Sequence, residues 1–90
     1  MRKQQINLNT VLLEILTPDK NIFSGEIDLI KVSGTKGSFE VLNMHAPIIS
    51  TLDKGQIKVL ENSGNENYYE IDSGVIEVQK NKIVVLVEMT

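Results

Sequence analysis

His45 is the one side chain in this 90-residue sequence that titrates near neutral pH, since the chain has no cysteine. Ser50, Thr51 and Asp53 follow it and are residue types that serve as nucleophile and orienting acid. Their spacing does not match a nucleophile elbow. We therefore interpret His45, which precedes Ala46-Pro47 at the start of a predicted strand, as a loop residue that binds a backbone carbonyl or a partner. Catalysis by His45 ranks third among the hypotheses.

Metal, phosphate and nucleic-acid chemistry each lack the residues they need. A single histidine with scattered carboxylates provides no metal-ligand spacing. Residues 34–37 read Gly-Thr-Lys-Gly, without the full spacing of a phosphate-binding loop. The chain carries 9 Lys and Arg against 12 Asp and Glu, spread singly, so it offers no basic surface for nucleic acid or an anionic membrane. We expect no metal, no cofactor and no nucleic-acid partner.

The composition predicts an all-β, single-domain protein. Ile and Val are abundant, whereas Ala, the strongest helix former, occurs once. Turn residues recur at short intervals, and no gap between them is long enough for a helical crossover. This rhythm predicts a two-sheet antiparallel β-sandwich over residues 11–90, preceded by a flexible extension at residues 1–10. No apolar run is long enough to insert into a membrane, and the absence of cysteine suits a reducing, cytoplasmic compartment.

The predicted strands differ in how many of their faces are apolar. Residues 56–61 and 67–72 alternate, which indicates one buried and one wet face, with an exposed hairpin tip at residues 62–66. Residues 83–87 are apolar on both faces, and residues 11–16 are nearly so. Two such strands are more than a free-standing domain of this size needs. We expect a docked partner to cover them, with covering loops as the alternative.

Residues 34–55 carry a motif of Gly-x-x-Gly, a short strand ending in Leu42, then His45-Ala46-Pro47, then Leu52-x-x-Gly. Leu-Thr-Pro-Asp at residues 16–19 and Phe-Ser-Gly-Glu at residues 23–26 precede it, and Ser-Gly-Val-Ile-Glu-Val at residues 73–78 follows it. In this order and spacing, the blocks closely resemble the epsilon subunit of F-type ATP synthases. The resemblance covers residues 11–88, and it implies the same two-sheet β-sandwich.

The resemblance further implies a non-catalytic rotor subunit at the foot of the central stalk. Such a subunit docks the gamma subunit onto the c ring, so that proton flow is coupled to ATP synthesis, on the cytoplasmic side of the bacterial inner membrane. By position in the motif, the residues matching the gamma side are Thr17, His45 and Ser50. Those matching the loop that faces the ring are Gly34, Thr35, Lys36, Gly37, Ser38 and Phe39.

Three departures limit what the resemblance implies. Asn43-Met44 stands where family members commonly carry proline before the histidine, and Ser38 stands where an acidic residue is frequent. The family usually continues into a pair of C-terminal helices, whereas this sequence stops at Thr90, so we expect neither autoinhibition nor nucleotide binding. The alternative function is a free-standing β-sandwich that binds a peptide or a sugar through the hairpin at residues 56–72.

Overall fold

The computed structural model describes residues 11–42 and 47–89, and these form eight β-strands with no helix among them. Ile, Val and Thr favour this extended backbone because their branched side chains pack well on a pleated surface. The predicted all-β class is confirmed. The strands are β1 (Val11–Leu16), β2 (Asn21–Gly34), β3 (Gly37–Leu42), β4 (Ile48–Leu52), β5 (Gly55–Glu61), β6 (Glu66–Ile71), β7 (Ser73–Gln79) and β8 (Lys82–Glu88).

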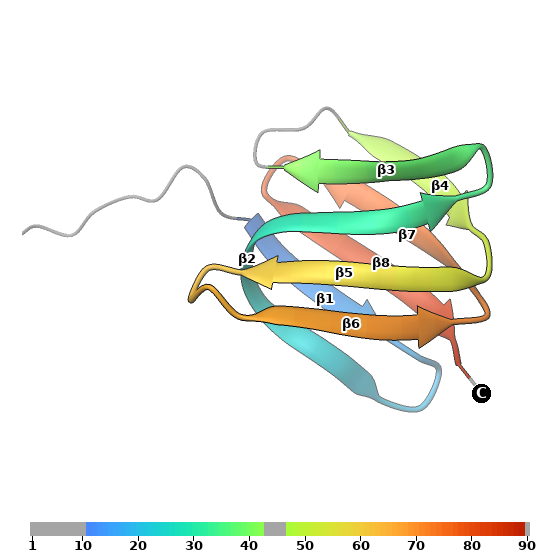
Figure 1. Ribbon diagram of the computed structural model, residues 1–90, viewed down its shortest axis with the longest axis horizontal. Coiled ribbons are helices and arrows are strands. Elements are labelled where there is room, and N and C mark those ends of the chain that lie inside the picture. The colour runs from blue at the N-terminus through green and yellow to red at the C-terminus, as the bar shows by residue number, and fades with distance from the viewer. Residues whose placement is uncertain (1–10, 43–46, 90) are drawn as a thin grey trace, which may run out of the picture.

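The strands lie in two layers that pack face to face (Figure 1). The front layer contains β3, β2, β5 and β6, and the back layer contains β1, β8, β7 and β4. β2 belongs to both layers: residues up to Ile27 pair with β1, and residues from Leu29 onward pair with β3 and β5. The register with β5 shifts between Ile27 and Leu29, and such a bulge lets a strand bend from one layer into the other. The predicted β-sandwich is confirmed, and its two layers are parts of one hydrogen-bonded sheet because they share β2.

One strand pair departs from the predicted antiparallel arrangement. β1 and β8, the first and last strands, pair in parallel, with Ile15 opposite Val85. A parallel pair needs a long connection between its strands. Here the connection is the rest of the sandwich, so no helical crossover is required.

The core between the layers consists almost entirely of β-branched side chains, and no polar side chain is buried among the described residues. Strand alternation explains this composition, since every second residue points into the sandwich. The wet-faced hairpin is confirmed: residues 62–66 are exposed, while Ile57, Val59 and Ile71 are buried. The buried residues are Val11, Leu13, Ile15, Ile27, Ile30, Val32, Val41, Leu52, Ile57, Val59, Ile71, Ile76, Val78, Ile83, Val85 and Val87.

Candidate functional site

An apolar stripe crosses the outer face of the back layer and is formed by Leu16, Leu86 and Val75. Leu86 on β8 is the register partner of Leu16 on β1 and of Val75 on β7. Leu86 is 52% exposed and Val75 is 38% exposed, whereas Val85 and Val87, on either side of Leu86, are buried. Among the described residues no loop covers Leu86, so a docked partner stays the predicted cover for the stripe.

The stripe opens into a cavity of about 650 Å³ at one end of the sandwich. This is the end at which β1, β2 and β8 all finish, on the right of Figure 1. Leu16, Val75 and Leu86 line one side of the cavity, and Thr17 and Pro18 from the β1–β2 turn line another. The cavity is therefore a hollowed continuation of the apolar stripe, and it can accept an apolar side chain from another protein.

Carboxylates flank the apolar stripe along the strands on both sides. Glu14 lies two residues before Leu16 on β1, and Glu77 lies two residues after Val75 on β7. Both are on the side of the stripe away from the cavity. Asp53 and Glu88 are exposed and line the cavity on the other side. Glu14 contacts Lys82, with 3.8 Å between Oε1 and Nζ. The flanks are predominantly acidic, which favours a partner surface with cationic residues on either side of an apolar ridge.

A second cavity, of about 700 Å³, lies beside the turn that joins β2 to β3. Residues 34–39 form one wall, and residues 48–51 of β4 form the other. Gly37 has a φ of +122°, a conformation that a residue with a Cβ rarely adopts, so glycine is needed there for the tight turn. Gly34 is buried, and a Cβ on it would lie 2.9 Å from the carbonyl oxygen of Gly37. Backbone geometry therefore explains why glycine occupies both positions. Thr35 and Lys36 lie between the two glycines and are exposed.

The three residues expected to face gamma have different environments. Thr17 is half-buried and lines the first cavity, where its hydroxyl accepts a hydrogen bond from the backbone N–H of Lys20 at 3.1 Å. Ser50 is half-buried, lines the second cavity, and donates a hydrogen bond to the carbonyl oxygen of Thr51 at 3.1 Å. His45 lies outside the described residues. Thr17 and Ser50 thus line neighbouring cavities, and Thr35 of the turn expected to face the ring lines both.

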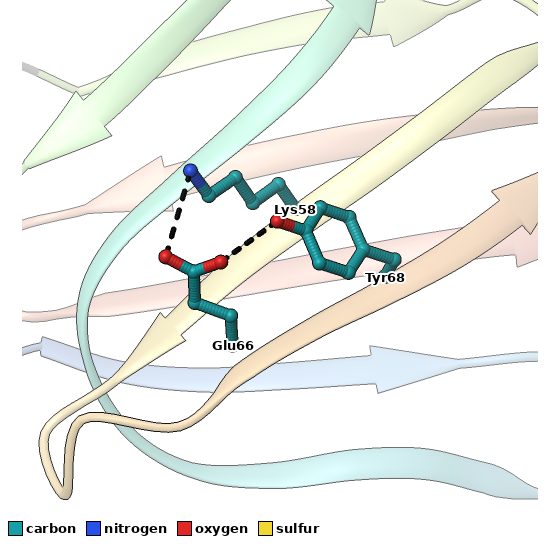
Figure 2. Close-up of polar contacts among 3 residues, drawn as sticks. All are labelled: Lys58, Glu66 and Tyr68. Carbon is teal, nitrogen blue, oxygen red and sulfur yellow. Dashed lines mark hydrogen bonds and ion pairs between the residues drawn. The ribbon is translucent and has the colours of Figure 1, made fainter.

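Polar side chains on the outer face of the front layer contact one another. Figure 2 shows that Glu66 bridges two residues: it accepts a hydrogen bond from the Tyr68 hydroxyl at 2.7 Å and lies 3.8 Å from Lys58 Nζ. The hydrogen bond to Glu66 raises the pKa of Tyr68. On the same face Gln56 donates a hydrogen bond to Glu70 at 3.0 Å. These internal contacts leave this face with less need of a partner than the apolar stripe has.

The aromatic residues bear on the alternative function of peptide or sugar binding. Phe23, Phe39 and Tyr69 pack against the core, and Tyr68 is 51% exposed. A sugar site generally needs exposed aromatic rings. The hairpin of β5 and β6 has Tyr68 as its one exposed ring among the described residues. Peptide or sugar binding therefore stays a prediction.

Sequence reasoning did not single out two exposed apolar residues of the back layer, Val75 and Ile49. Ile49 is 74% exposed on the outward face of β4. Both lie in strands whose sequence mixes apolar and polar residues, so no run of apolar residues draws attention to them. Val75 lies beside Leu86 of β8 and Ile49 lies on β4, the next strand after β7, and this placement becomes visible only once the strand order is known.

No group of carboxylate or histidine side chains in residues 11–42 and 47–89 could hold a metal ion. Within the same ranges, no helix is long and apolar enough to cross a membrane. The fold and the exposed stripe define a class of protein: a small β-sandwich with an apolar surface of the kind that binds other proteins.

The chain belongs to the family described as "ATP synthase, Delta/Epsilon chain, beta-sandwich domain", which matches residues 10–90. This confirms the resemblance seen in the sequence. The chain is 38% identical to the ATP synthase epsilon chain of Chlorobaculum tepidum over 84% of this chain and 86% of that one. It is 36% identical to the epsilon chain of Campylobacter fetus subsp. fetus over 90% of this chain, which spans 63% of that relative.

Solved structures show the same fold at lower sequence identity. A chain of the Euglena gracilis mitochondrial ATP synthase, in a structure of OSCP, F1 and c-ring, superposes with a TM-score of 0.83 and 19% identity. The match covers 96% of this chain and 54% of that chain. A chain from the central stalk and c-ring of the Tetrahymena thermophila enzyme has a TM-score of 0.70, 18% identity, and coverage of 86% and 62%.

Proposed function

We propose that this chain is the non-catalytic central-stalk subunit of a proton-translocating F-type ATP synthase, which docks the gamma subunit onto the c ring and so couples proton flow to ATP synthesis. The observation that carries the proposal is the exposed apolar stripe of Leu16, Leu86 and Val75 in a chain of this family. A close-packed sandwich deforms little, so it can transmit torque between two partners. The chain itself contributes no catalytic group and binds no nucleotide in this role.

Gamma is the partner assigned to the apolar stripe. The cavity at its end contains Thr17, the residue whose position in the family motif corresponds to the gamma side. The flanking carboxylates of Asp53 and Glu88 favour a gamma surface with Lys or Arg beside its apolar residues. Exposed charge pairs of this kind are screened by salt. We therefore expect association to slow as ionic strength rises.

The c ring is assigned to the turn at residues 34–39. This turn projects from the same end of the sandwich as the cavity, and its exposed residues are polar. It suits contact with polar loops of a ring at the membrane surface. The chain would then be peripheral, on the cytoplasmic side of the bacterial inner membrane.

The test of the gamma assignment is co-elution of the chain with its cognate gamma subunit on size exclusion, with the stoichiometry checked by native mass spectrometry. Wild type should form a one-to-one complex. Leu86→Asp should weaken it at least about 100-fold, since a charge pressed into an apolar contact costs several kcal/mol. Tyr68→Asp is the matched control: Tyr68 is 51% exposed against 52% for Leu86, but it lies on the other layer. Equal losses in both variants, or no wild-type complex, would contradict the assignment.

The test of the ring assignment is proton pumping in vesicles that contain the whole enzyme. Lys36→Glu should reduce ATP-driven pumping without changing the thermal unfolding of the isolated chain. Lys80→Glu is the control, because Lys80 is also exposed but lies in the β7–β8 turn at the opposite end of the sandwich. Wild-type pumping in the Lys36 variant would remove this residue from the ring contact.

A further inference from the structure

The ring of strands in this sandwich is closed at a single point, which we call the β2–β4 junction and define as residues 33–35 and 51–53. β2 pairs with β1, β1 with β8, β8 with β7, and β7 with β4. β4 returns to β2 through one residue pair, Gly34 with Leu52. Every other neighbouring pair in this ring is joined over five or more register positions. The connection between β4 and β2 therefore depends on few contacts. Each of them contributes more to holding the two strands together than one hydrogen bond in a longer ladder does.

Four hydrogen bonds surround this pair, and two of them come from side-chain hydroxyls. The backbone N–H of Asp53 donates to the carbonyl oxygen of Ser33 at 2.9 Å, and that of Thr35 donates to the carbonyl oxygen of Thr51 at 3.3 Å. The Ser33 hydroxyl donates to the carbonyl oxygen of Asp53 at 2.9 Å. The hydroxyl oxygens of Thr35 and Thr51 lie 3.1 Å apart and share a hydrogen bond. The two side-chain hydrogen bonds thus add to the two backbone hydrogen bonds that join β2 to β4.

The Ser33 side chain lies directly against the backbone of Gly55. A Cβ on Gly55 would lie 2.8 Å from Ser33 Oγ and 3.0 Å from Ser33 Cβ. Glycine at position 55 therefore leaves the space that the Ser33 side chain occupies. In that space the Ser33 hydroxyl donates its hydrogen bond to the carbonyl oxygen of Asp53.

The junction lies between the two cavities, since Thr35 and Thr51 line both of them. On one side is the apolar stripe assigned to gamma, and on the other is the turn at residues 34–39 assigned to the ring. The turn is closed by the pairs Gly34 with Gly37 and Ser33 with Ser38, so it moves as a unit with the end of β2. The junction joins that end of β2 to β4, which pairs with β7 of the apolar stripe.

We propose that the hydroxyls of Ser33 and Thr51 are positioning groups that hold the 34–39 turn at a fixed place relative to the gamma-binding stripe, so that ring and gamma turn together. This inference rests on the proposed function for its partners, but the holding of the turn is a property of the isolated chain. Ser33 lines neither cavity, so its hydroxyl acts on the two partner surfaces only through the geometry that it maintains.

The test combines Ser33→Ala with Thr51→Val, which removes both hydroxyls and preserves the shape of Thr51. Amide hydrogen exchange of Thr35 and Asp53, the two backbone donors across the junction, should accelerate at least about tenfold. Exchange of the Glu61 amide, which donates to Asn65 in the distant β5–β6 hairpin, should change less than about twofold. Ser24→Ala is the control, because Ser24 is an exposed serine on the same strand. Thr51→Ser alone should keep wild-type exchange because it retains the hydroxyl.

The binding measurement then separates the two proposals. In Ser33→Ala, whose side chain lines neither cavity, the affinity for gamma should stay within about twofold of wild type, while binding of the gamma complex to purified c ring in detergent should weaken at least about fivefold. Unchanged exchange at Thr35 and Asp53 overturns the positioning role, as does faster exchange with unchanged ring binding. A wild-type chain that binds neither gamma nor the ring overturns the proposed function instead, and the exchange rates still decide whether the hydroxyls hold the turn. If the double variant does not fold, Thr51→Val alone is measured against Thr51→Ser.

Discussion

Truncation of Val85 to alanine should destabilise the domain by about 2–3 kcal/mol, although it removes only two methyl groups. Val85 is 0% exposed, and its register partners on both sides, Ile15 and Ile76, are also 0% exposed. Each buried methyl group contributes about 0.8 kcal/mol through burial. The cavity left behind adds to this loss, because a core held by two neighbouring strands collapses only in part.

Truncation of Leu86 to alanine should cost less stability than truncation of Val85. Leu86 is larger than Val85, yet it is 52% exposed in the isolated chain. Its loss should cost less than about 1 kcal/mol, since half of the side chain is already in water. The order of the two costs is therefore the reverse of the order in side-chain size.

Urea unfolding followed by far-UV circular dichroism measures both costs. A domain of 90 residues has a total stability of roughly 4–13 kcal/mol, so the Val85→Ala loss is a large fraction of it. In thermal unfolding the same loss should lower Tm by about 8–24 °C. A Val85→Ala cost under about 0.5 kcal/mol would refute the burial of this face of β8. A Leu86→Ala cost equal to it would show that the outer face is covered in the isolated chain.

Three further predictions concern stability. Gly74→Ala should cost about 1–3 kcal/mol in urea unfolding, because the new Cβ would lie 2.7 Å from the carbonyl oxygen of Leu86; a neutral result would mean that β7 and β8 can separate there. Gly37→Ala should cost about 1–2 kcal/mol because of its φ of +122°, and Gly37→Asn should recover part of that loss. Burial raises the pKa of Tyr69 above its ordinary value, so the neutral phenol is favoured in the fold. Stability is then intact below pH about 10 and falls as pH rises through the raised pKa. Tyr69→Phe should reduce that fall in urea unfolding between pH about 9 and 11.5, and an unchanged fall would exclude Tyr69 as its cause.

Absorbance titration of phenolate offers a direct check on both tyrosines. The chain has two tyrosines and no tryptophan, so the signal belongs to Tyr68 and Tyr69 alone. Tyr68→Phe leaves Tyr69 as the single titrating phenol. Its midpoint should lie above that of an unfolded sample, and a midpoint at or below the unfolded one would contradict the burial of Tyr69.

The sequence predicted the fold class because its signals are local. Abundant Ile and Val, scarce Ala, and closely spaced turn residues are sufficient to exclude helices and to predict short strands. The alternation in β5 and β6 also assigned Ile57, Val59 and Ile71 to the core correctly. The family was visible in the ordered motif blocks across residues 16–78, before any geometry was known.

Strand order and the character of each outer face were decided by the tertiary structure. The apolar run of residues 83–87 indicated that Leu86 needs a cover, but it could not show that Val75 and Leu16 lie beside it. Those neighbours come from strands far away in the sequence, and the parallel pairing of β1 with β8 is a contact between the two ends of the fold. The β2–β4 junction is a similar case, since Ser33 and Asp53 meet only when the two layers close. The physical reason is that periodicity fixes which side of a strand is buried, whereas the partner across each strand is set by long-range packing that no local pattern encodes.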